Sequence, residues 1–238
     1  MTAKPGRHTG PADAHTRPIW NAREIVYDCE ILRAIPDKHP RVDGLAYCAG
    51  WKDFAGMGIA CICAIEVGIG LPRIFLQDNL AAFGEWTRGA LLIGFNNVSF
   101  DNELLRANHL YAAAGSYDIL RALRLAVGET AGYTPGLTRG GRTLRDCARA
   151  NLDGVVKLDD GANAPILAQH GKYGELVDYC LRDVMIERRL FLRRAAFIDP
   201  VLKVPVRLEG LHPAERSLER DRVASKREDL IDAIREAL

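Results

Sequence analysis

The sequence has little of several features that define other classes of protein. The formal net charge is only +1 over 238 residues, so the chain as a whole has no general attraction to nucleic acid or membrane. There is no signal peptide, no long apolar run, no internal repeat and no low-complexity tract. We therefore expect a cytoplasmic protein that does not use a membrane, and any site for a polyanion must be a local patch.

Cysteine patterns typical of zinc sites are also missing. The six cysteines stand at positions 29, 48, 61, 63, 147 and 180, mostly inside apolar segments, which indicates reduced thiols. Cys61 and Cys63 share one face of a predicted strand, but their spacing is too short for the usual zinc pattern. We interpret these two residues as part of the hydrophobic core.

Apolar residues make up 48% of the chain, which is enough for a substantial core in one domain with appendages. Residues 1–20 are rich in Pro, Gly, Thr and His and predict a flexible arm. Residues 21–200 form the predicted folded domain, in which the Gly- and Pro-rich stretch 132–141 is a loop. Residues 201–238 are an extension with a strand and, at 213–238, an exposed charged helix that would dock on a partner or on the domain.

The order of the predicted elements indicates the fold class. Apolar, β-rich segments come first, at residues 24–30, 58–67 and 73–76. A short helix at 80–87 and a fourth strand at 90–95 follow, and helical periodicity dominates from there to residue 196. Strands followed by alternating strand and helix predict an α/β fold, a mixed β-sheet flanked by α-helices.

The first predicted strand, "EIVYDCEI", ends with two carboxylates one residue apart. Because strand side chains alternate, Asp28 and Glu30 point to one face while Tyr27, Cys29 and Ile31 point to the other. Two like charges at such positions repel and need a compensating cation, which is an Arg, a Lys or a metal ion. For this pair alone, a strand end that runs into solvent is the favoured explanation, so other segments must decide.

Two further acidic positions lie at defined places. Asp101, in "LLIGFNNVSFDNELL", stands where a strand leads into a helix; a carboxylate favoured by the helix dipole is the simpler explanation. Tyr179 and Asp183, in "GELVDYCLRDVMIERRLF", are four residues apart and so share one face of an amphipathic helix. Here the simpler explanation is a Tyr at the core edge and an Asp paired with a neighbour such as Arg182.

Taken together, the three segments resemble the DEDD superfamily of 3′-to-5′ exonucleases, which have a ribonuclease H-like fold. The shared order is Asp-x-Glu on a first strand, Asn-x-x-x-Phe-Asp at a strand-to-helix turn and Tyr-x-x-x-Asp on a late helix. "GFNNVSFDNELL" is similar to the second motif of proofreading domains in family B DNA polymerases. The segments "GWKDFAGMGI", "LRDCARANL" and "APILAQHGKYGELVDYCLRDV" are similar to phage-type relatives. The resemblance spans residues 25–191.

One position distinguishes the subfamilies. The histidine type carries His five residues before the last Asp, where this chain has Asp178, and the tyrosine type carries Tyr four residues before, which is Tyr179. None of the six histidines falls near the motif, so the resemblance implies the tyrosine type. It implies catalytic roles for Asp28, Glu30, Asp101, Tyr179 and Asp183.

The resemblance also implies cofactors. Oxygen-only ligands suit hard ions, two Mg²⁺ or Mn²⁺, rather than zinc. By resemblance, Asp28, Glu30 and Asp183 hold one ion, and Asp28 holds the second together with the terminal phosphate, with Asp101 assisting through water. Two-ion sites activate a water and stabilise the leaving 3′-oxygen. Tyr179, with a free pKa of about 10, is a poor base and is expected to orient the water.

Contacts with the substrate strand are expected from the second motif and from a basic segment. Residues 118–149 hold six arginines against three acidic residues, a local excess of positive charge suited to phosphates. Asn96, Asn97, Phe100, Arg142 and Arg145 are the predicted nucleic-acid contacts, with Phe100 stacking on a base. Solvated helix faces with ordinary ion pairs explain any single Arg as well.

The expected function is metal-dependent hydrolysis of single-stranded DNA from its 3′ end, with release of nucleoside 5′-monophosphates. An RNA exonuclease with the same site is the first alternative, and DNA is preferred on the polymerase resemblance alone. A nucleic-acid-binding subunit of a replication or recombination complex is the second; the complete set of carboxylates argues against it. A ribonuclease H-type endonuclease is disfavoured by Tyr179. The sequence has no polymerase or helicase motif, so proofreading would need a partner protein.

Overall fold

The computed structural model describes residues 22–36, 38, 41–129, 141–153 and 163–208. Three predictions lie wholly or mostly outside these residues: the arm at 1–20, the loop at 132–141 and the charged helix at 213–238. The described residues therefore cover most of the predicted domain and the first residues of the C-terminal extension.

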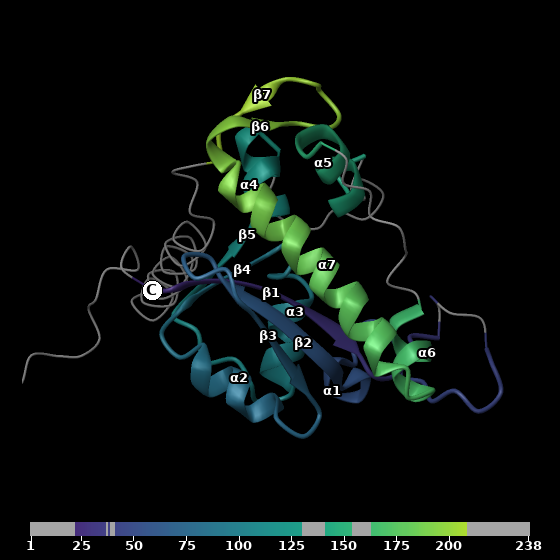
Figure 1. Ribbon diagram of the computed structural model, residues 1–238. Coiled ribbons are helices and arrows are strands. Elements are labelled where there is room, and N and C mark those ends of the chain that lie inside the picture. The colour runs from purple at the N-terminus through teal and green to yellow at the C-terminus, as the bar shows by residue number, and fades with distance from the viewer. Residues whose placement is uncertain (1–21, 37, 39–40, 130–140, 154–162, 209–238) are drawn as a thin grey trace, which may run out of the picture.

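A five-stranded mixed sheet forms the centre of the molecule (Figure 1), with the strand order β3-β2-β1-β4-β5. β1 pairs antiparallel with β2, and β2 with β3, whereas β1, β4 and β5 run parallel to one another. The strands are β1 (Glu24–Ile31), β2 (Ile59–Glu66), β3 (Pro72–Leu76), β4 (Leu91–Gly94) and β5 (Gly115–Asp118).

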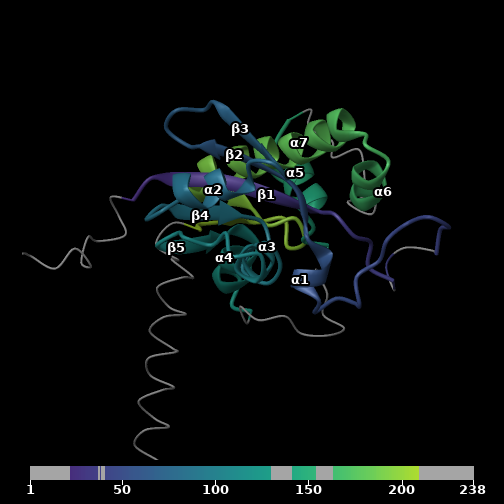
Figure 2. The same ribbon diagram turned by 90° about the horizontal axis from the view of Figure 1, so that it is seen from below.

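Helices cover both faces of this sheet. α6 and α7 lie on one side of β1, and α1 and α3 lie on the other (Figure 2). The helices are α1 (Phe54–Met57), α2 (Leu80–Trp86), α3 (Asp101–Ala107), α4 (Ile119–Ala126), α5 (Leu144–Asn151), α6 (Ala164–Gln169) and α7 (Tyr173–Leu192). A 3₁₀ turn, η3 (Arg194–Ala196), and a two-stranded sheet of β6 (Phe197–Ile198) and β7 (Pro205–Val206) follow.

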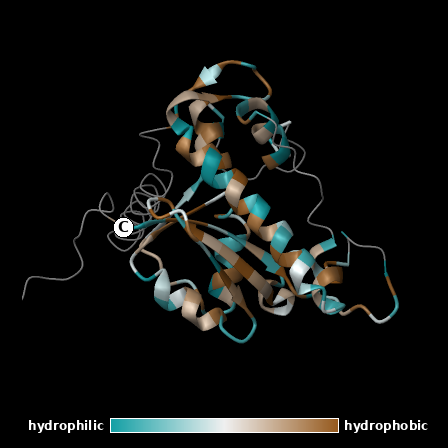
Figure 3. Ribbon diagram, viewed as in Figure 1, coloured by the Kyte–Doolittle hydropathy of each residue, from teal (hydrophilic) through white to brown (hydrophobic). Residues whose placement is uncertain are grey.

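The alternation of side chains along β1 divides the core into two clusters. Ile25 and Tyr27 face a cluster that α1, α2 and α3 complete. Val26 faces the other cluster, to which α4, α5, α6 and α7 contribute. α7 is amphipathic, and its apolar positions Leu176 and Val184 are fully buried in this second cluster. Hydrophobic residues accordingly run along the strands, whereas hydrophobic and hydrophilic residues alternate along α7 (Figure 3).

The predicted α/β fold, a mixed sheet flanked by helices, is confirmed and is consistent with a ribonuclease H-like fold. The four predicted strands and the helix at 80–87 also agree closely with β1 to β4 and α2. The prediction of helix from residue 96 onward is wrong at Gly115–Asp118, which forms β5. Four residues that begin with Gly are too short to show a twofold period, and pairing with β4 makes them a strand.

Within the described ranges, no helix combines the length and the apolar character that crossing a membrane requires.

Candidate metal centre

Asp28 and Glu30 share one face of β1, as their spacing predicts, and this is the face that α7 covers. Their neighbours on β2 are Cys63, opposite Asp28, and Cys61, opposite Glu30. The strand register shifts between Glu30 and Ile31, and Ile31 then pairs with Ile59 of β2. Asp28 keeps partial contact with solvent, whereas Glu30 is 7% exposed. Two carboxylates are therefore held side by side at the edge of the core.

Asp101 is the first residue of α3 and is buried. Its carboxylate accepts a hydrogen bond from the backbone N–H of Cys29, which stands between the two acidic residues of β1. The next residue, Asn102, accepts a hydrogen bond from the Tyr27 hydroxyl over 2.7 Å. The beginning of α3 is thus bonded to β1 at two neighbouring positions, and Asp101 lies beside Asp28.

The turn between β4 and α3 sets this position. A Cβ on Gly94 would lie 2.8 Å from the Cβ of Asn97, so only glycine allows the chain to fold back so closely. Asn96 has a φ of +65°, a conformation that Asn tolerates better than most residues. Asp118, at the end of β5, accepts hydrogen bonds from the N–H groups of Asn96 (3.0 Å) and Val98 (3.3 Å). The neighbouring strand therefore holds the turn that leads to Asp101.

α7 supplies the remaining residues from above the sheet. Asp183 is buried, and the Tyr179 hydroxyl one turn earlier donates a hydrogen bond to it. One turn after Asp183 lies Glu187, which is also buried and accepts a hydrogen bond from the backbone N–H of Phe95 over 3.2 Å. The alternative pairing of Asp183 with Arg182 is not the one observed, since Arg182 bonds Asp178 over 3.0 Å.

We call the group of Asp28, Glu30, Asp101, Tyr179 and Asp183 the carboxylate centre. Its charges act on one another strongly. Burial raises the pKa of Asp28 well above its ordinary value, and the charges of Glu30, Asp101, Glu187 and Asp183 raise it further. Burial also raises the pKa of Asp101 to about 7, despite the hydrogen bond from Cys29. Such crowding of carboxylates is costly unless a cation offsets the charge.

The donor chemistry of the centre suits a metal ion. Atoms of Asp28, Glu30 and Cys180 that can act as ligands all lie within 4.8 Å of one another. Two of these are carboxylate oxygens, and Asp101 and Asp183 add further oxygen donors nearby. The structure thus has a group of side chains that can hold a metal.

Burial of Arg142 and Asn97 argues against two of the predicted nucleic-acid contacts. Arg142 is buried, and its guanidinium bonds Asp199 (2.6 Å) and Glu129 (2.8 Å), so it is a structural residue rather than a phosphate ligand. Asn97 is fully buried and donates to Ser116 Oγ over 2.9 Å, which gives it a role in the turn. Burial thus weighs against both residues as contacts with nucleic acid.

The other three predicted contacts stay predictions. Asn96 and Phe100 lie in the partly exposed segment that precedes Asp101. The Phe100 ring packs edge-on against Phe54, with ring centroids 5.8 Å apart. Arg145 is partly buried on α5, which packs against α7.

Sequence reasoning missed two carboxylates near the centre. Glu187 continues the spacing of four residues that begins with Tyr179 and Asp183, so the helical period alone could have indicated it. Asp118 counted only as one charge of the basic segment, because β5 was not recognised. Since parallel strands end at the same edge of a sheet, recognition of β5 would have indicated Asp118 near Asp101.

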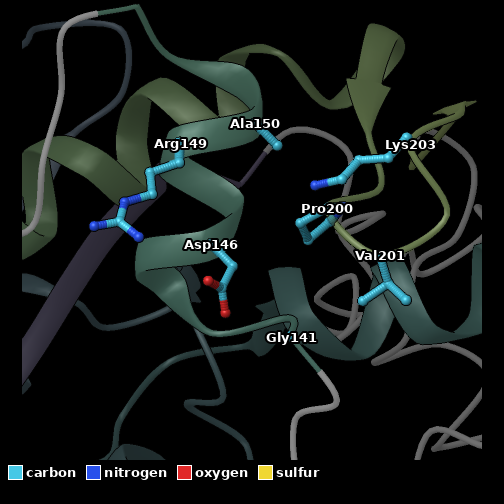
Figure 4. Close-up of a pocket in the computed structure, with 7 residues that line it drawn as sticks. All are labelled: Gly141, Asp146, Arg149, Ala150, Pro200, Val201 and Lys203. Carbon is cyan, nitrogen blue, oxygen red and sulfur yellow. The ribbon is translucent and has the colours of Figure 1, made fainter.

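A separate hollow of about 520 Å³ lies between α5 and the segment that joins β6 to β7 (Figure 4). Asp146 and Arg149 of α5 line it on one side, and Val201 and Lys203 line it on the other. None of the described residues that line this hollow belongs to the carboxylate centre. The hollow and the centre are therefore distinct features.

Comparison of the sequence with protein-family models and with curated proteins finds no match.

Proposed function

We propose that the protein is a metal-dependent 3′-to-5′ exonuclease of the tyrosine-type DEDD class, acting on the 3′ end of single-stranded DNA. One observation carries the proposal: four carboxylates from β1, α3 and α7 meet beside a tyrosine that bonds one of them. Three separate sequence segments supply these residues, and each alone has a simpler explanation. Their meeting at one place supports the resemblance of the three motifs to this class of exonuclease.

Two Mg²⁺ or Mn²⁺ ions are the proposed cofactors, with Asp28, Glu30 and Asp183 as ligands and Asp101 assisting. When bound, such ions activate a water and stabilise the leaving 3′-oxygen. The raised pKa values of Asp28 and Asp101 support this assignment, because a divalent ion would favour the charged forms that burial and neighbouring carboxylates disfavour. Glu187, buried one turn after Asp183 on α7, would add further negative charge near Asp28.

Tyr179 would orient the attacking water. Burial and the charge of Asp183 raise its pKa above the ordinary value, so the hydroxyl stays protonated at neutral pH and cannot act as a base. Its proton is donated to Asp183, which leaves oxygen lone pairs that can accept a hydrogen bond from water. A hydroxyl fixed in this way selects one direction of attack on the phosphorus.

The test is degradation of 5′-labelled single-stranded DNA and RNA of one sequence, with Mg²⁺, Mn²⁺ or EDTA. We expect a ladder that shortens from the 3′ end of the DNA, is absent in EDTA, and falls by roughly 10³-fold or more in Asp28→Ala and Asp183→Asn. Asp178→Asn is the matched control: it is the same change on the same helix, but Asp178 is exposed and bonds Arg182. This control should keep full activity.

Other outcomes would select the alternatives. A ladder on RNA but not on DNA would favour an RNA exonuclease with the same centre. Internal cuts in place of a ladder would favour an endonuclease. No cleavage of either strand by folded protein, together with binding of both, would overturn the proposal in favour of a binding subunit.

A further inference from the structure

Three buried thiols meet beside the carboxylate centre. The Sγ atoms of Cys61, Cys63 and Cys180 all lie within 4.8 Å of one another, and the three side chains are fully buried. Cys61 and Cys63 come from β2, and Cys180 comes from α7, which crosses that face of the sheet. Their packing in the core agrees with the sequence prediction, but their meeting with Cys180 was not foreseen. We call them the thiol cluster.

The thiol cluster and the carboxylate centre are neighbours on the same sheet face. Cys63 lies opposite Asp28 and Cys61 lies opposite Glu30 in the antiparallel pairing of β1 with β2. Cys180 belongs to both groups: its Sγ is within 4.8 Å of ligand oxygens of Asp28 and Glu30, and it donates to the Asp28 carbonyl over 3.4 Å. An oxygen site and a sulfur site therefore share one boundary residue.

We propose that the thiol cluster binds one thiophilic divalent cation, of the Cd²⁺ or Zn²⁺ class, and that this ion inhibits the carboxylate centre. Thiolates select soft ions, whereas Mg²⁺ and Mn²⁺ prefer the oxygen donors beside them. At a Zn–S bond length of about 2.3 Å, tetrahedral thiolates lie about 3.8 Å apart. Because the Sγ atoms already lie within 4.8 Å, binding needs a contraction of about 1 Å or less.

Binding changes the contacts of the carboxylate centre. Three S–H protons leave to solvent as three sulfur–metal bonds form, so affinity should rise with pH. Contraction draws Cys180 toward Cys61 and Cys63 on β2, and so disturbs its contact with the carbonyl of Asp28. Cys180 follows Tyr179 directly and lies one turn from Asp183, so a shift of this turn misplaces both. The inhibition rests on the proposed exonuclease function, whereas the binding does not.

The binding is tested with Cd²⁺ alone, added to reduced full-length protein in excess Mg²⁺. We expect one equivalent to produce the ultraviolet charge-transfer band of cadmium thiolates, and X-ray absorption to find three sulfur neighbours. Cys63→Ala should lose the band and weaken binding by more than the roughly 10- to 100-fold that loss of an outer-shell partner costs. Cys147→Ala is the matched control, because Cys147 is equally buried but lies on α5.

The first outcome that would overturn the site is measured on the wild-type protein, so it does not depend on the folding of a variant. Oxygen neighbours alone, or one sulfur with two oxygens, would overturn the three-thiol site and assign the ion to the carboxylates. An equal loss of the band in the Cys63 and Cys147 variants would overturn it as well. Cys61→Ser provides a second, smaller change that should also abolish the band.

The inhibition is tested separately with the labelled-DNA assay in Mg²⁺. One equivalent of Cd²⁺ should reduce the cleavage rate of the wild type and Cys147→Ala at least about tenfold and leave Cys63→Ala unaffected. Cadmium bound by three thiols with unchanged cleavage would overturn the inhibition and leave the site in place. Absence of cleavage before any Cd²⁺ is added would refute the exonuclease function instead, and the spectroscopic result would still decide the site.

Discussion

Two buried groups of charged side chains in this protein have opposite electrostatic character. Beside α5, the Arg142 guanidinium bonds the Asp199 carboxylate over 2.6 Å. This bond, together with hydrogen bonds that Asp199 accepts from neighbouring backbone N–H groups, holds the pKa of Asp199 below its ordinary value. At the end of β1, burial and the charges of other carboxylates raise the pKa of Asp28. The first group contains the cation that its carboxylate needs. The second is a gathering of negative charge.

This difference separates a structural role from a functional one. A paired and buried carboxylate such as Asp199 orders its surroundings: it also accepts hydrogen bonds from the N–H groups of Val201 and Leu202, over 2.8 and 2.6 Å. Carboxylates that repel one another in the core weaken the fold, so their presence calls for a ligand that offsets the charge. Aspartate thus supports the fold after β6, at Asp199, and supports the proposed chemistry at the end of β1, at Asp28.

Removal of the Arg142 cation from its buried pair with Asp199 should have the largest effect on stability. Arg142→Ala leaves Asp199 buried without its guanidinium partner, and breaking a buried pair in this way costs about 3–5 kcal/mol of unfolding free energy. The measurement is urea unfolding in EDTA. Arg182→Ala is the control, because its ion pair with Asp178 is exposed and should contribute about 0–1 kcal/mol. Equal losses in the two variants would contradict the contrast.

The carboxylate centre should make stability depend on pH in a metal-sensitive way. The pKa of Asp101 is about 7 in the folded protein, against an ordinary value of 3.8. Between these values the folded state holds a proton that the unfolded chain has released, so the free energy of unfolding falls as pH rises from about 4 to about 7. We expect this fall in EDTA, measured by urea unfolding at each pH.

Divalent ions should reverse this fall, because a bound Mn²⁺ favours the charged form of the carboxylates. Asp101→Asn should make the pH profile in EDTA less steep, while Asp28 keeps its contribution, and should also reduce the gain from Mn²⁺. A wild-type profile in EDTA that is flat from pH 4 to 7 would show that the crowding of these carboxylates is relieved without a metal.

The parts of the site that follow from local periodicity could be predicted from the sequence. Alternation along a strand put Asp28 and Glu30 on one face, and the helical period put Tyr179 one turn from Asp183; both arrangements are observed. The second motif also placed Asp101 correctly at the first position of a helix. Each of these inferences needs only the geometry of one element.

The parts that depend on pairing between distant segments could not be predicted in the same way. β5 is a strand because it pairs with β4. Without this strand, the sequence pattern gave no reason to expect Asp118 near Asp101. Arg142 reads as a solvent-facing cation of a basic segment, yet its partner Asp199 comes from 57 residues further along the chain. The thiol cluster likewise requires the register of β1 with β2 and the position of α7.

Within the carboxylate centre, removal of the Tyr179 hydroxyl should show whether this group orients the attacking water or helps to bind the metal. Tyr179→Phe removes the hydrogen bond to Asp183 but no carboxylate, so we expect a loss of cleavage rate on the order of 10²-fold with the Mn²⁺ affinity unchanged. Single-turnover cleavage and calorimetric titration with Mn²⁺ measure the two quantities. Tyr173→Phe, near the beginning of the same helix, is the control and should change neither. A parallel loss of Mn²⁺ affinity in Tyr179→Phe would mean that the hydroxyl serves the ligands instead.

Asp118 combines the structural role of Asp199 with an electrostatic effect on the carboxylate centre, and its substitution should have the smallest effect of those considered. Its carboxylate accepts hydrogen bonds from three backbone N–H groups, those of Asn96, Val98 and Arg121, but its charge also raises the pKa of Asp101. Asp118→Asn should therefore cost about 1–3 kcal/mol of stability at pH 5, because the turn loses charge-assisted hydrogen bonds. The cost should shrink toward pH 8, where relief of repulsion with ionised Asp101 offsets part of it. Urea unfolding of both proteins at the two pH values measures the difference, and a cost that grows with pH would show that Asp118 is purely structural.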